Sequence, residues 1–464
     1  MAEEITETIK LLGEAIAGRD DSAFLKIEGS MHHADLAAAF KELKEPEDRE
    51  FFLKTLSPER FSDILPELPE NLVEGSLNQF KPSEQREILE ATTDDDRVDI
   101  LQDVSDDTRS RLLGLLEKEE EELTRTLLRY EEDTAGGRMT TQIGRLPVDL
   151  TLQEALDTLR EEEEDTEHLA RIIVIDDNQH PLGIVRLRDL AFGNRSAPIR
   201  DIMRPVEQSI LATADQEEAA HMVSKYDLVL LPVVDESGRL LGAVTHDDAM
   251  EILKEESTED IEKIAGLTGD QSEEGYLNTT VFTHFRRRFL WLLVLAFLAI
   301  ASGYIMLRFE SVLDSAFILA LFLPMVIAAG GNTGGQAATM VIRAMALGEL
   351  DDGNILRVAW KELRLGLFLG TFLGICIAAA AIFILPLFKP NIPVDMGFVE
   401  FGLTIALALA IQVTASTLIG ALLPLWARSA KLDPAVIAAP AITTVVDVSG
   451  MIIYFTVVRA LLGL

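Results

Sequence analysis

The chain has 464 residues, 48% of them hydrophobic, and 77 acidic against 41 basic side chains give it a formal net charge of −36. So acidic a chain repels the phosphate backbone of nucleic acids, and we exclude them as partners. Its single cysteine, Cys376, excludes an intrachain disulfide and suits a reduced cytosolic compartment.

Residues 1–31 are expected to form an N-terminal extension, and residues 32–131 an acidic domain of short helices. Helix-start signals, in which a proline or a Ser/Thr cap is followed by acids, recur about every twelve residues. Apolar pairs between these signals would bury one face of each helix on its neighbours, as in a helical solenoid. The signals are Ser57-Pro58-Glu59, Leu68-Pro69-Glu70, Lys81-Pro82-Ser83-Glu84, Thr93-Asp94-Asp95 and Ser105-Asp106-Asp107.

An internal duplication follows these helices, in which two similar stretches of sequence share three residues at the same spacing. Each copy predicts a β-branched strand, an Asp/Gly turn, a second strand and the acidic start of a helix. The pair resembles tandem CBS domains, α/β regulatory modules that often bind adenine nucleotides, and it would cover residues 137–246. The shared residues are Asp176, Gly183 and Asp189, which return as Asp235, Gly242 and Asp248.

The nucleotide motif of such domains is Gly-x-x-Thr-x-x-Asp. The second copy has it in full, ending on Thr245 and Asp248, whereas the first copy has Arg186 in place of the threonine. The resemblance therefore implies at most weak binding of ATP as a modulator. The residues concerned would be Arg188, Asp189, Thr245 and Asp248.

Residues 247–284 predict a charged connecting helix and a linker that lead to the first apolar stretch. The carboxylates of this helix recur at spacings of three and four residues, so many share one face, where like charges cost stability. Such a face is either simply solvated or holds divalent cations as part of a metal switch. The carboxylates are Asp248, Glu251, Glu255, Glu256, Glu259 and Asp260.

Residues 285–464 contain five long apolar stretches, most of them longer than the about 18–20 residues that span a bilayer. The second is expected to be one helix crossed by a small, polar band at residues 330–336. If the N-terminal half is cytosolic, nine basic residues flank the spans on the inner side and three on the outer side, which places the C-terminus outside. The stretches are 289–306, 316–347, 365–388, 399–426 and 440–464.

The charge divides between the two halves of the chain. From Phe285 onward there are 12 basic and 10 acidic side chains, which gives this part a net charge of +2 and leaves −38 for the part before it. This acidity is either a heavily solvated surface, as in halophilic proteins, or a means of binding divalent cations.

Asp447 is the only acidic residue inside the last apolar stretch. A carboxylate within a bilayer costs a few kcal/mol at least and is retained mainly where it lines an ion path or a wet cavity. A structural bond to a neighbouring helix is the alternative. No histidine and only one cysteine lie in the spans, which argues against a soft transition-metal site.

The order of these parts closely resembles the MgtE family of magnesium channels, over about residues 32–464. The resemblance rests on the polar band at residues 330–336 and on the run from Asp433-Pro434-Ala435 to Asp447. It implies a multidomain membrane protein with an all-α helical solenoid, an α/β CBS pair, a long connecting helix and a five-helix transmembrane domain. It also implies a homodimer in the cytoplasmic membrane.

The resemblance assigns roles to individual residues. Asp447 would be the permeation carboxylate and Asp433 the acid at the cytosolic mouth of the pore, with Pro434 and Pro440 making the entrance irregular rather than one straight helix. Some members carry an Asn where this chain has Ala439, so a polar contact to the hydrated ion is missing here. Cytosolic metal sites would use Asp63, Asp95, Asp99, Glu217, Asp227, Asp248, Glu251, Glu256, Glu259 and Asp260, and the pore would be lined at Asn332, Thr333, Gln336, Ala439, Thr443 and Thr444.

We therefore expect a Mg²⁺ channel for uptake across the cytoplasmic membrane, closed by cytosolic Mg²⁺ bound to the acidic soluble half. One alternative is a broader channel for divalent cations such as Co²⁺ or Mn²⁺. Another is a membrane-anchored CBS nucleotide sensor, although a pure sensor has no need of Asp447. An enzyme is not expected, because the sequence assembles no nucleophile, general base or phosphate-binding loop.

Overall fold

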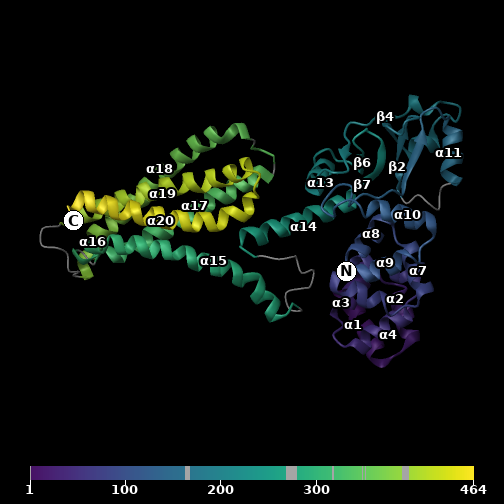
Figure 1. The fold of residues 1–464 in the computed structure, drawn as a ribbon, viewed down its shortest axis with the longest axis horizontal. Coiled ribbons are helices and arrows are strands. Elements are labelled where there is room, and N and C mark those ends of the chain that lie inside the picture. The colour runs from purple at the N-terminus through teal and green to yellow at the C-terminus, as the bar shows by residue number, and fades with distance from the viewer. Residues whose placement is uncertain are drawn as a thin grey trace. The chain divides into compact units, whose positions relative to one another are not determined.

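The computed structural model describes residues 2–161, 168–267, 279–315, 318–346, 348–350, 352–388 and 397–463. The chain divides into two units, which are drawn in Figure 1 and described separately here. The N-terminal unit is formed mainly by Met1–Glu256. The C-terminal unit is formed by Ser257–Gln271 and Gly275–Leu464.

The N-terminal unit begins with a series of short helices, as the repeated start signals predict. Ser57, Lys81, Thr93 and Ser105 each stand at the N-cap of a helix. The first two helices of the chain share a core with the others, because Leu12 and Phe24 belong to the same buried cluster as Phe52 and Phe61. The elements are α1 (Ala2–Gly18), α2 (Asp21–Glu28), α3 (His33–Glu42), α4 (Pro46–Thr55), α5 (Pro58–Ser62), η1 (Leu65–Glu67), α6 (Glu70–Leu77), α7 (Pro82–Ala91), α8 (Asp94–Gln102), α9 (Asp106–Leu113) and α10 (Lys118–Leu127).

The duplicated region forms two small sheets with helices. In each sheet a parallel pair of strands is followed by an antiparallel hairpin, giving the orders β1-β2-β3-β4 and β5-β6-β7. The predicted α/β pair of similar modules is confirmed. The elements are β1 (Ile143–Pro147), α11 (Leu152–Glu161), β2 (His168–Ile175), β3 (Pro181–Arg186), α12 (Leu187–Phe192), η3 (Ile199–Asp201), β4 (Arg204–Pro205), β5 (Ile210–Leu211), α13 (Gln216–Lys225), β6 (Leu230–Val234), β7 (Leu240–Thr245) and α14 (His246–Ile264).

The hairpin turns of the two copies contain the same pair of backbone-to-aspartate hydrogen bonds. Oδ1 of Asp176 accepts from the backbone N–H groups of Asn178 and His180, each at 2.8 Å. Oδ1 of Asp235, the equivalent residue of the second copy, accepts from the backbone N–H groups two and four residues after it, each at 2.9 Å. The short carboxylate satisfies the turn's amides, which explains why an aspartate stands at both positions.

Each copy lends its opening segment to the other copy's sheet. Thr140, before the first copy, bridges Ala243 in the second, and Arg204, which opens the second copy, pairs with Ile184 in the first. The hairpin glycines make room for this exchange, because a Cβ on Gly242 would lie 2.4 Å from the carbonyl oxygen of Thr140. The two copies are therefore interlocked by backbone contacts.

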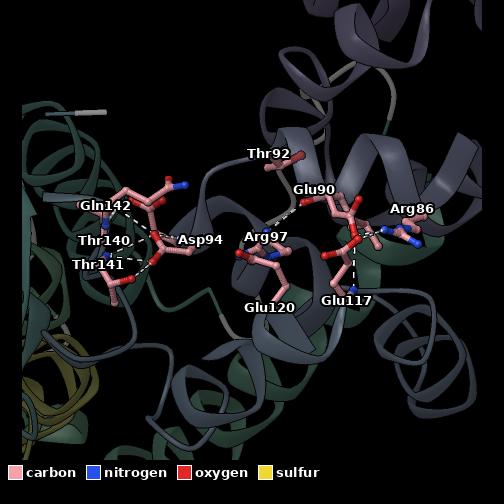
Figure 2. Close-up of polar contacts among 12 residues, drawn as sticks. Arg86, Glu90, Thr92, Asp94, Arg97, Glu117, Glu120, Thr140, Thr141 and Gln142 are labelled. Carbon is pink, nitrogen blue, oxygen red and sulfur yellow. Dashed lines mark hydrogen bonds and ion pairs between the residues drawn. The ribbon is translucent and has the colours of Figure 1, made fainter. Parts of the chain in front are cut away.

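Asp94, at the start of α8, ties the helical domain to this pair. Its carboxylate is 1% exposed and accepts from the hydroxyl of Thr140 at 2.8 Å and from the backbone N–H of Thr141 at 2.9 Å, as well as from the Thr141 hydroxyl (Figure 2). Nearby, Val98 and Leu127 of the helical domain are part of one buried cluster with residues of the second copy. The junction thus has a core of its own.

Replacing Asp94 by Ala is expected to destabilise the protein by about 3 kcal/mol, because the buried Thr140 and the partly buried Thr141 lose hydrogen bonds to a charged acceptor. Thermal unfolding of the full chain in detergent measures this. Asp106→Ala is the matched control, since Asp106 is the first residue of the next helix and its side chain is 94% exposed. Equal destabilisation by the two substitutions would show that the effect comes from helix starts and not from the junction.

The C-terminal unit is helical, and α17, α18, α19 and α20 run side by side in it (Figure 1). Four stretches among the described residues are long and apolar enough to cross a membrane, namely Val281–Arg308, Ile355–Phe388, Phe398–Ser429 and Thr444–Leu462. The protein is therefore a membrane protein. The elements are α15 (Val281–Arg308), α16 (Glu310–Ser315), α17 (Leu319–Ala346), η4 (Asp352–Asn354), α18 (Ile355–Phe383), η5 (Leu385–Phe388), α19 (Phe398–Ser429) and α20 (Pro434–Leu462).

Two expectations about these helices have different outcomes. The polar band at residues 330–336 lies inside the continuous helix α17, as predicted, while a fifth span remains a prediction because this band makes α17 less apolar than the four stretches above. The irregular pore entrance is wrong, since α20 is one helix from Pro434 to Leu462. Pro434 starts it, where no amide donor is needed, and Pro440 removes only one backbone bond in the second turn.

Glycines let α18 and α19 touch backbone to backbone. A Cβ on Gly370 would lie 2.6 Å from the carbonyl oxygen of Ala410, and one on Gly374 would lie 2.9 Å from that of Ala406. One turn earlier, a Cβ on Gly366 would meet the Thr417 hydroxyl at 2.3 Å. Any side chain at these three positions would push the two helices apart.

Candidate functional site

Side chains from three parts of the N-terminal unit, two of them acidic, converge on Arg138. Its guanidinium donates to Asp99 of α8 at 3.2 Å, to Glu255 of α14 at 3.0 Å and to the amide oxygen of Gln216 of α13 at 2.9 Å. Gln216 in turn donates to Glu256 of α14 at 2.6 Å. Two further acids act through their charges, Glu251 on Arg138 and Asp248 on Asp95. We call this group the Arg138 cluster; it consists of Asp95, Asp99, Arg138, Gln216, Asp248, Glu251, Glu255 and Glu256.

The Arg138 cluster holds carboxylates in a costly environment. Burial raises the pKa of Asp99 to about 7, although the charge of Arg138 opposes the shift. Burial, followed by the charge of Asp248, raises the pKa of Asp95 well above its ordinary value. Loss of hydration and repulsion between like charges are the physical causes. A cation that binds here would relieve both.

Two oxygens in the Arg138 cluster fit such a cation. Oδ1 of Asp95 and Oδ1 of Asp99 are buried and accept no hydrogen bond from any described residue. Carboxylate oxygens are the ligands that Mg²⁺ prefers. Within the described ranges, however, no three acidic, histidine or cysteine side chains are already arranged to hold a metal ion. Arg138 supplies the positive charge that holds these acids together.

The other predicted cytosolic ligands lie elsewhere. Asp63 accepts from Arg60 at 3.1 Å, and Glu217 contacts His221 at 3.3 Å. Asp227 is exposed and adopts a left-handed backbone conformation, with φ of 51°. In the part of the chain that the structure describes, these three do not join the Arg138 cluster.

The second half of α14 belongs to the C-terminal unit and contacts the expected pore mouth. Nζ of Lys263 lies 2.8 Å from Oε1 of Glu259 and 3.0 Å from Oδ2 of Asp433. Although desolvation opposes it, bonding to these two carboxylates raises the pKa of Lys263 above its ordinary value, so the ammonium stays charged. Asp260 lies in the same half of α14.

Two contacts hold this end of the helix against α15. Glu262 forms an ion pair with Arg287. Gly266, with φ of +70°, lies so close to the Trp291 ring that a Cβ would come within 2.0 Å of its indole nitrogen. The start of the first span is therefore attached directly to the end of the connecting helix.

In the membrane part, Asp447 lies half-buried on α20, and Thr444 is half-buried one turn before it. Asn332 and Gln336 of α17 are exposed within this chain, whereas the Thr333 hydroxyl donates to its own helix, to the Ala329 carbonyl at 2.9 Å. Of Ala439 and Thr443 the structure describes only the helical backbone. Pore lining by these residues remains a prediction.

The two copies of the nucleotide motif differ in their bonding. Thr245 of the second copy donates to Asp248 at 2.6 Å. In the first copy Arg186 replaces the threonine and donates to both carboxylate oxygens of Asp189, at 2.7 and 3.1 Å. Arg188 is largely exposed beside them. The Asp189 carboxylate is therefore already engaged by a side chain of its own turn.

Sequence reasoning missed the basic partners of these acids. Arg138 follows Gly136-Gly137 and has no motif that predicts its contacts, which join residues up to 117 positions apart. Lys263 stands four residues after Glu259, a spacing that favours a local ion pair on a helix, but nothing in the sequence indicates its contact with Asp433.

Comparison with known proteins finds matches along most of the chain. Family models match at residues 31–133 (MgtE intracellular N domain), at 135–192 and 199–255 (CBS domain), and at 323–457 (MgtE, divalent cation transporter). Proteins named magnesium transporter MgtE are similar along nearly their whole length. The protein of Thermus thermophilus is 35% identical over 97% of this chain and 98% of its own, and that of Bacillus subtilis is 29% identical over 94% and 93%.

A solved structure also resembles the N-terminal part. The cytosolic domain of the Mg²⁺ channel MgtE in complex with ATP superimposes with a TM-score of 0.50 at 35% identity, covering 53% of this chain and 99% of that one. The helical domain, the CBS pair and the apolar helices thus occur here in the order that the relatives share. This chain belongs to the MgtE family of divalent cation transporters.

Proposed function

We propose that the protein is a Mg²⁺-selective channel that admits Mg²⁺ through the cytoplasmic membrane. The observation that carries the proposal is its 35% identity to a magnesium transporter along nearly the entire chain. Asp447 on α20 and Asp433, the residue before the start of α20, would act on the permeating ion. Each would hold the ion through its water shell. Asn332, Thr333, Gln336, Ala439, Thr443 and Thr444 would line the path.

We further propose that cytosolic Mg²⁺ closes the channel through the acidic N-terminal unit and α14. Asp95 and Asp99, with their buried free oxygens, and Asp248, Glu251 and Glu256 would hold the ion, which supplies the positive charge that their crowding lacks. Asp63, Glu217, Asp227, Glu259 and Asp260 would take part in further sites. Arg138 and Lys263 would share these carboxylates with the ion, so they set how much Mg²⁺ is needed.

The assembly and the orientation belong to the same proposal. A homodimer would bring two copies of Asp447 to one path, with the N-terminus in the cytosol and the C-terminus outside, as the basic flanks indicate. ATP would act as a modulator at Arg188, Asp189, Thr245 and Asp248. The ATP complex of the similar cytosolic domain supports this, while the Arg186–Asp189 bond argues for weak binding.

Patch recordings from membranes that contain the purified protein test the proposal, with Mg²⁺ titrated on the cytosolic side. We expect a Mg²⁺ current that falls as internal Mg²⁺ rises. The family description, divalent cation transporter, and the missing Asn at Ala439 favour a second candidate, a channel that also passes Co²⁺ or Mn²⁺. Equal currents for these ions would select it, and no current for any of them would contradict both.

The high pKa of Asp99 makes stability depend on pH. Because the folded-state pKa of about 7 lies above the unfolded value of about 3.9, Asp99 favours folding at low pH, and this contribution is lost as pH rises from 4 through 7. Without Mg²⁺, Asp99→Asn should therefore raise the thermal midpoint at pH 8 and leave it nearly unchanged at pH 4.5. The side chain is 37% exposed and water screens it, so we expect about 1 kcal/mol.

Addition of Mg²⁺ at pH 8 should raise the thermal midpoint of the unchanged protein above that of Asp99→Asn, because only the deprotonated carboxylate binds the ion. Scanning fluorimetry of the full chain at several pH values measures both effects. Asp106→Asn, at a side chain that is 94% exposed, is the control that removes one charge without touching the Arg138 cluster. Identical pH profiles for the two variants would refute the role of Asp99.

A further inference from the structure

A buried glutamine lies between three of the membrane helices. Gln412, in the middle of α19, is 0% exposed and donates from its amide nitrogen to the carbonyl oxygen of Val446 on α20 at 3.0 Å and to the Ser416 hydroxyl at 3.0 Å. A backbone carbonyl can only accept a hydrogen bond, so the nitrogen end of the amide must face Val446. The orientation of the side chain is therefore fixed by chemistry.

Glycines on the two neighbouring helices make the space for this amide. A Cβ on Gly330 of α17 would lie 2.5 Å from the Gln412 nitrogen, and one on Gly450 of α20 would lie 2.8 Å from it. A Cβ on Gly330 would also lie 3.1 Å from a methyl group of Val446. The glutamine thus occupies a place that α17 and α20 leave open at the same level of the bundle.

Packing alone does not account for a glutamine at this place. Its amide oxygen is buried and accepts no hydrogen bond from the described residues. A buried, unpaired carbonyl oxygen costs about 1–3 kcal/mol, whereas a methionine of similar length would fill the same volume without that cost. The benefit of the amide must therefore come from its two hydrogen bonds, of which only the one to Val446 reaches another helix.

Val446 immediately precedes Asp447. Its side chain is 0% exposed and packs with Ala338, Ile342 and Ile442. Neighbouring residues on a helix are related by a fixed rotation and a fixed rise along its axis, so holding the backbone of Val446 fixes the direction and the depth of the Asp447 side chain. Gln412 is the polar tie from another helix to that backbone.

We propose that Gln412 is a positioning residue for Asp447, an inference that rests on the proposed function. Its amide holds α20 at the turn that carries the permeation carboxylate, so that the carboxylate stays directed at the ion path. In enzymes, displacement of an acting group by about 1 Å can reduce the rate about 100-fold, and we expect a carboxylate on an ion path to depend on its position in a similar way. The glutamine thus gives up stability in return for the placement of one side chain.

Gln412→Met tests the proposal because it keeps the volume and removes the donor. The proposal expects the maximal Mg²⁺ current or flux to fall about tenfold or more, while the thermal midpoint stays equal to that of the unchanged protein or rises. Ser416→Ala is the matched control, since it removes the other acceptor of the same amide and leaves the bond to Val446. We expect it to conduct normally.

Three results would contradict the proposal. Normal conduction by Gln412→Met, in a preparation where Asp447→Asn does not conduct, would overturn the role of Gln412 and leave the proposed function intact. A parallel loss of conduction and of thermal stability in Gln412→Met would make Gln412 a structural residue only. Absence of Mg²⁺ current in the unchanged protein would overturn the proposed function, and this inference with it.

Discussion

Asp447→Asn is expected to reduce Mg²⁺ flux to the level of liposomes that contain no protein. The substitution keeps the shape of the side chain and removes the negative charge that offsets the cost of bringing a divalent ion into the bilayer. Proteoliposomes with a Mg²⁺-sensitive dye measure the flux. Size-exclusion chromatography of the same variant should show an unchanged assembly, because an amide of the same size leaves the helix contacts of α20 in place.

Asp314→Asn is the control for this experiment. Asp314 is an exposed acid on α16 of the same unit, and its substitution removes the same charge outside the long apolar helices. It should leave the flux unchanged. Normal flux through Asp447→Asn would sink the assignment of Asp447 to the ion path and would favour a purely structural carboxylate.

The second large effect is expected on α14. Combined substitution Glu256→Gln, Glu259→Gln and Asp260→Asn should leave the channel open at internal Mg²⁺ concentrations that close the unchanged protein. Loss of one charged contact costs about 1.5–3 kcal/mol, and 1.4 kcal/mol is a tenfold change, so the half-closing concentration should rise about tenfold or more. Inside-out patches with graded Mg²⁺ measure this shift.

Two further measurements separate specific binding from simple screening. Mg²⁺ should protect the acidic N-terminal unit from protease better than Na⁺ at equal ionic strength, and the triple variant should lose this difference. A variant with Glu42, Glu45 and Glu67 changed to Gln removes three exposed charges from the helical domain. This variant should still be protected better by Mg²⁺ than by Na⁺. Equal protection by both salts in the unchanged protein would show that α14 is a solvated acidic face.

Local sequence patterns predicted those features that depend on neighbouring residues. The capped helix starts hold because a proline or a short polar side chain satisfies the first turn of a helix within a few residues. The repeat of Asp176 as Asp235 likewise predicted both hairpin turns, since each carboxylate accepts from the amides two and four residues after it. These interactions are complete within a single window of sequence.

Features that depend on distant residues could not be predicted in the same way. The exchange of opening segments between the two CBS copies pairs Thr140 with Ala243, and no local pattern specifies which sheet an edge strand joins. The sequence predicts groups of acids around a metal ion but not the basic side chains that bind some of these acids. The nitrogens of Arg138 lie 3.0–3.2 Å from carboxylate oxygens, and that of Lys263 lies 2.8–3.0 Å from them. Before Phe285 the 67 acidic side chains outnumber the 29 basic ones, which is why each basic partner matters.

The glycine contacts between α18 and α19 decide which helices can move. Gly366, Gly370 and Gly374 seat the backbone of one helix against the other, so a shear of even one residue would drive larger side chains into that contact. The pair α18 and α19 must therefore behave as one rigid body. By contrast, no described residue of α15 is buried within the chain, and α15 is the helix to which the end of α14 is fastened through Arg287 and Trp291. A displacement of α14 would therefore act first on α15, which contacts the bundle through α20, whereas the close contact of α18 with α19 resists sliding.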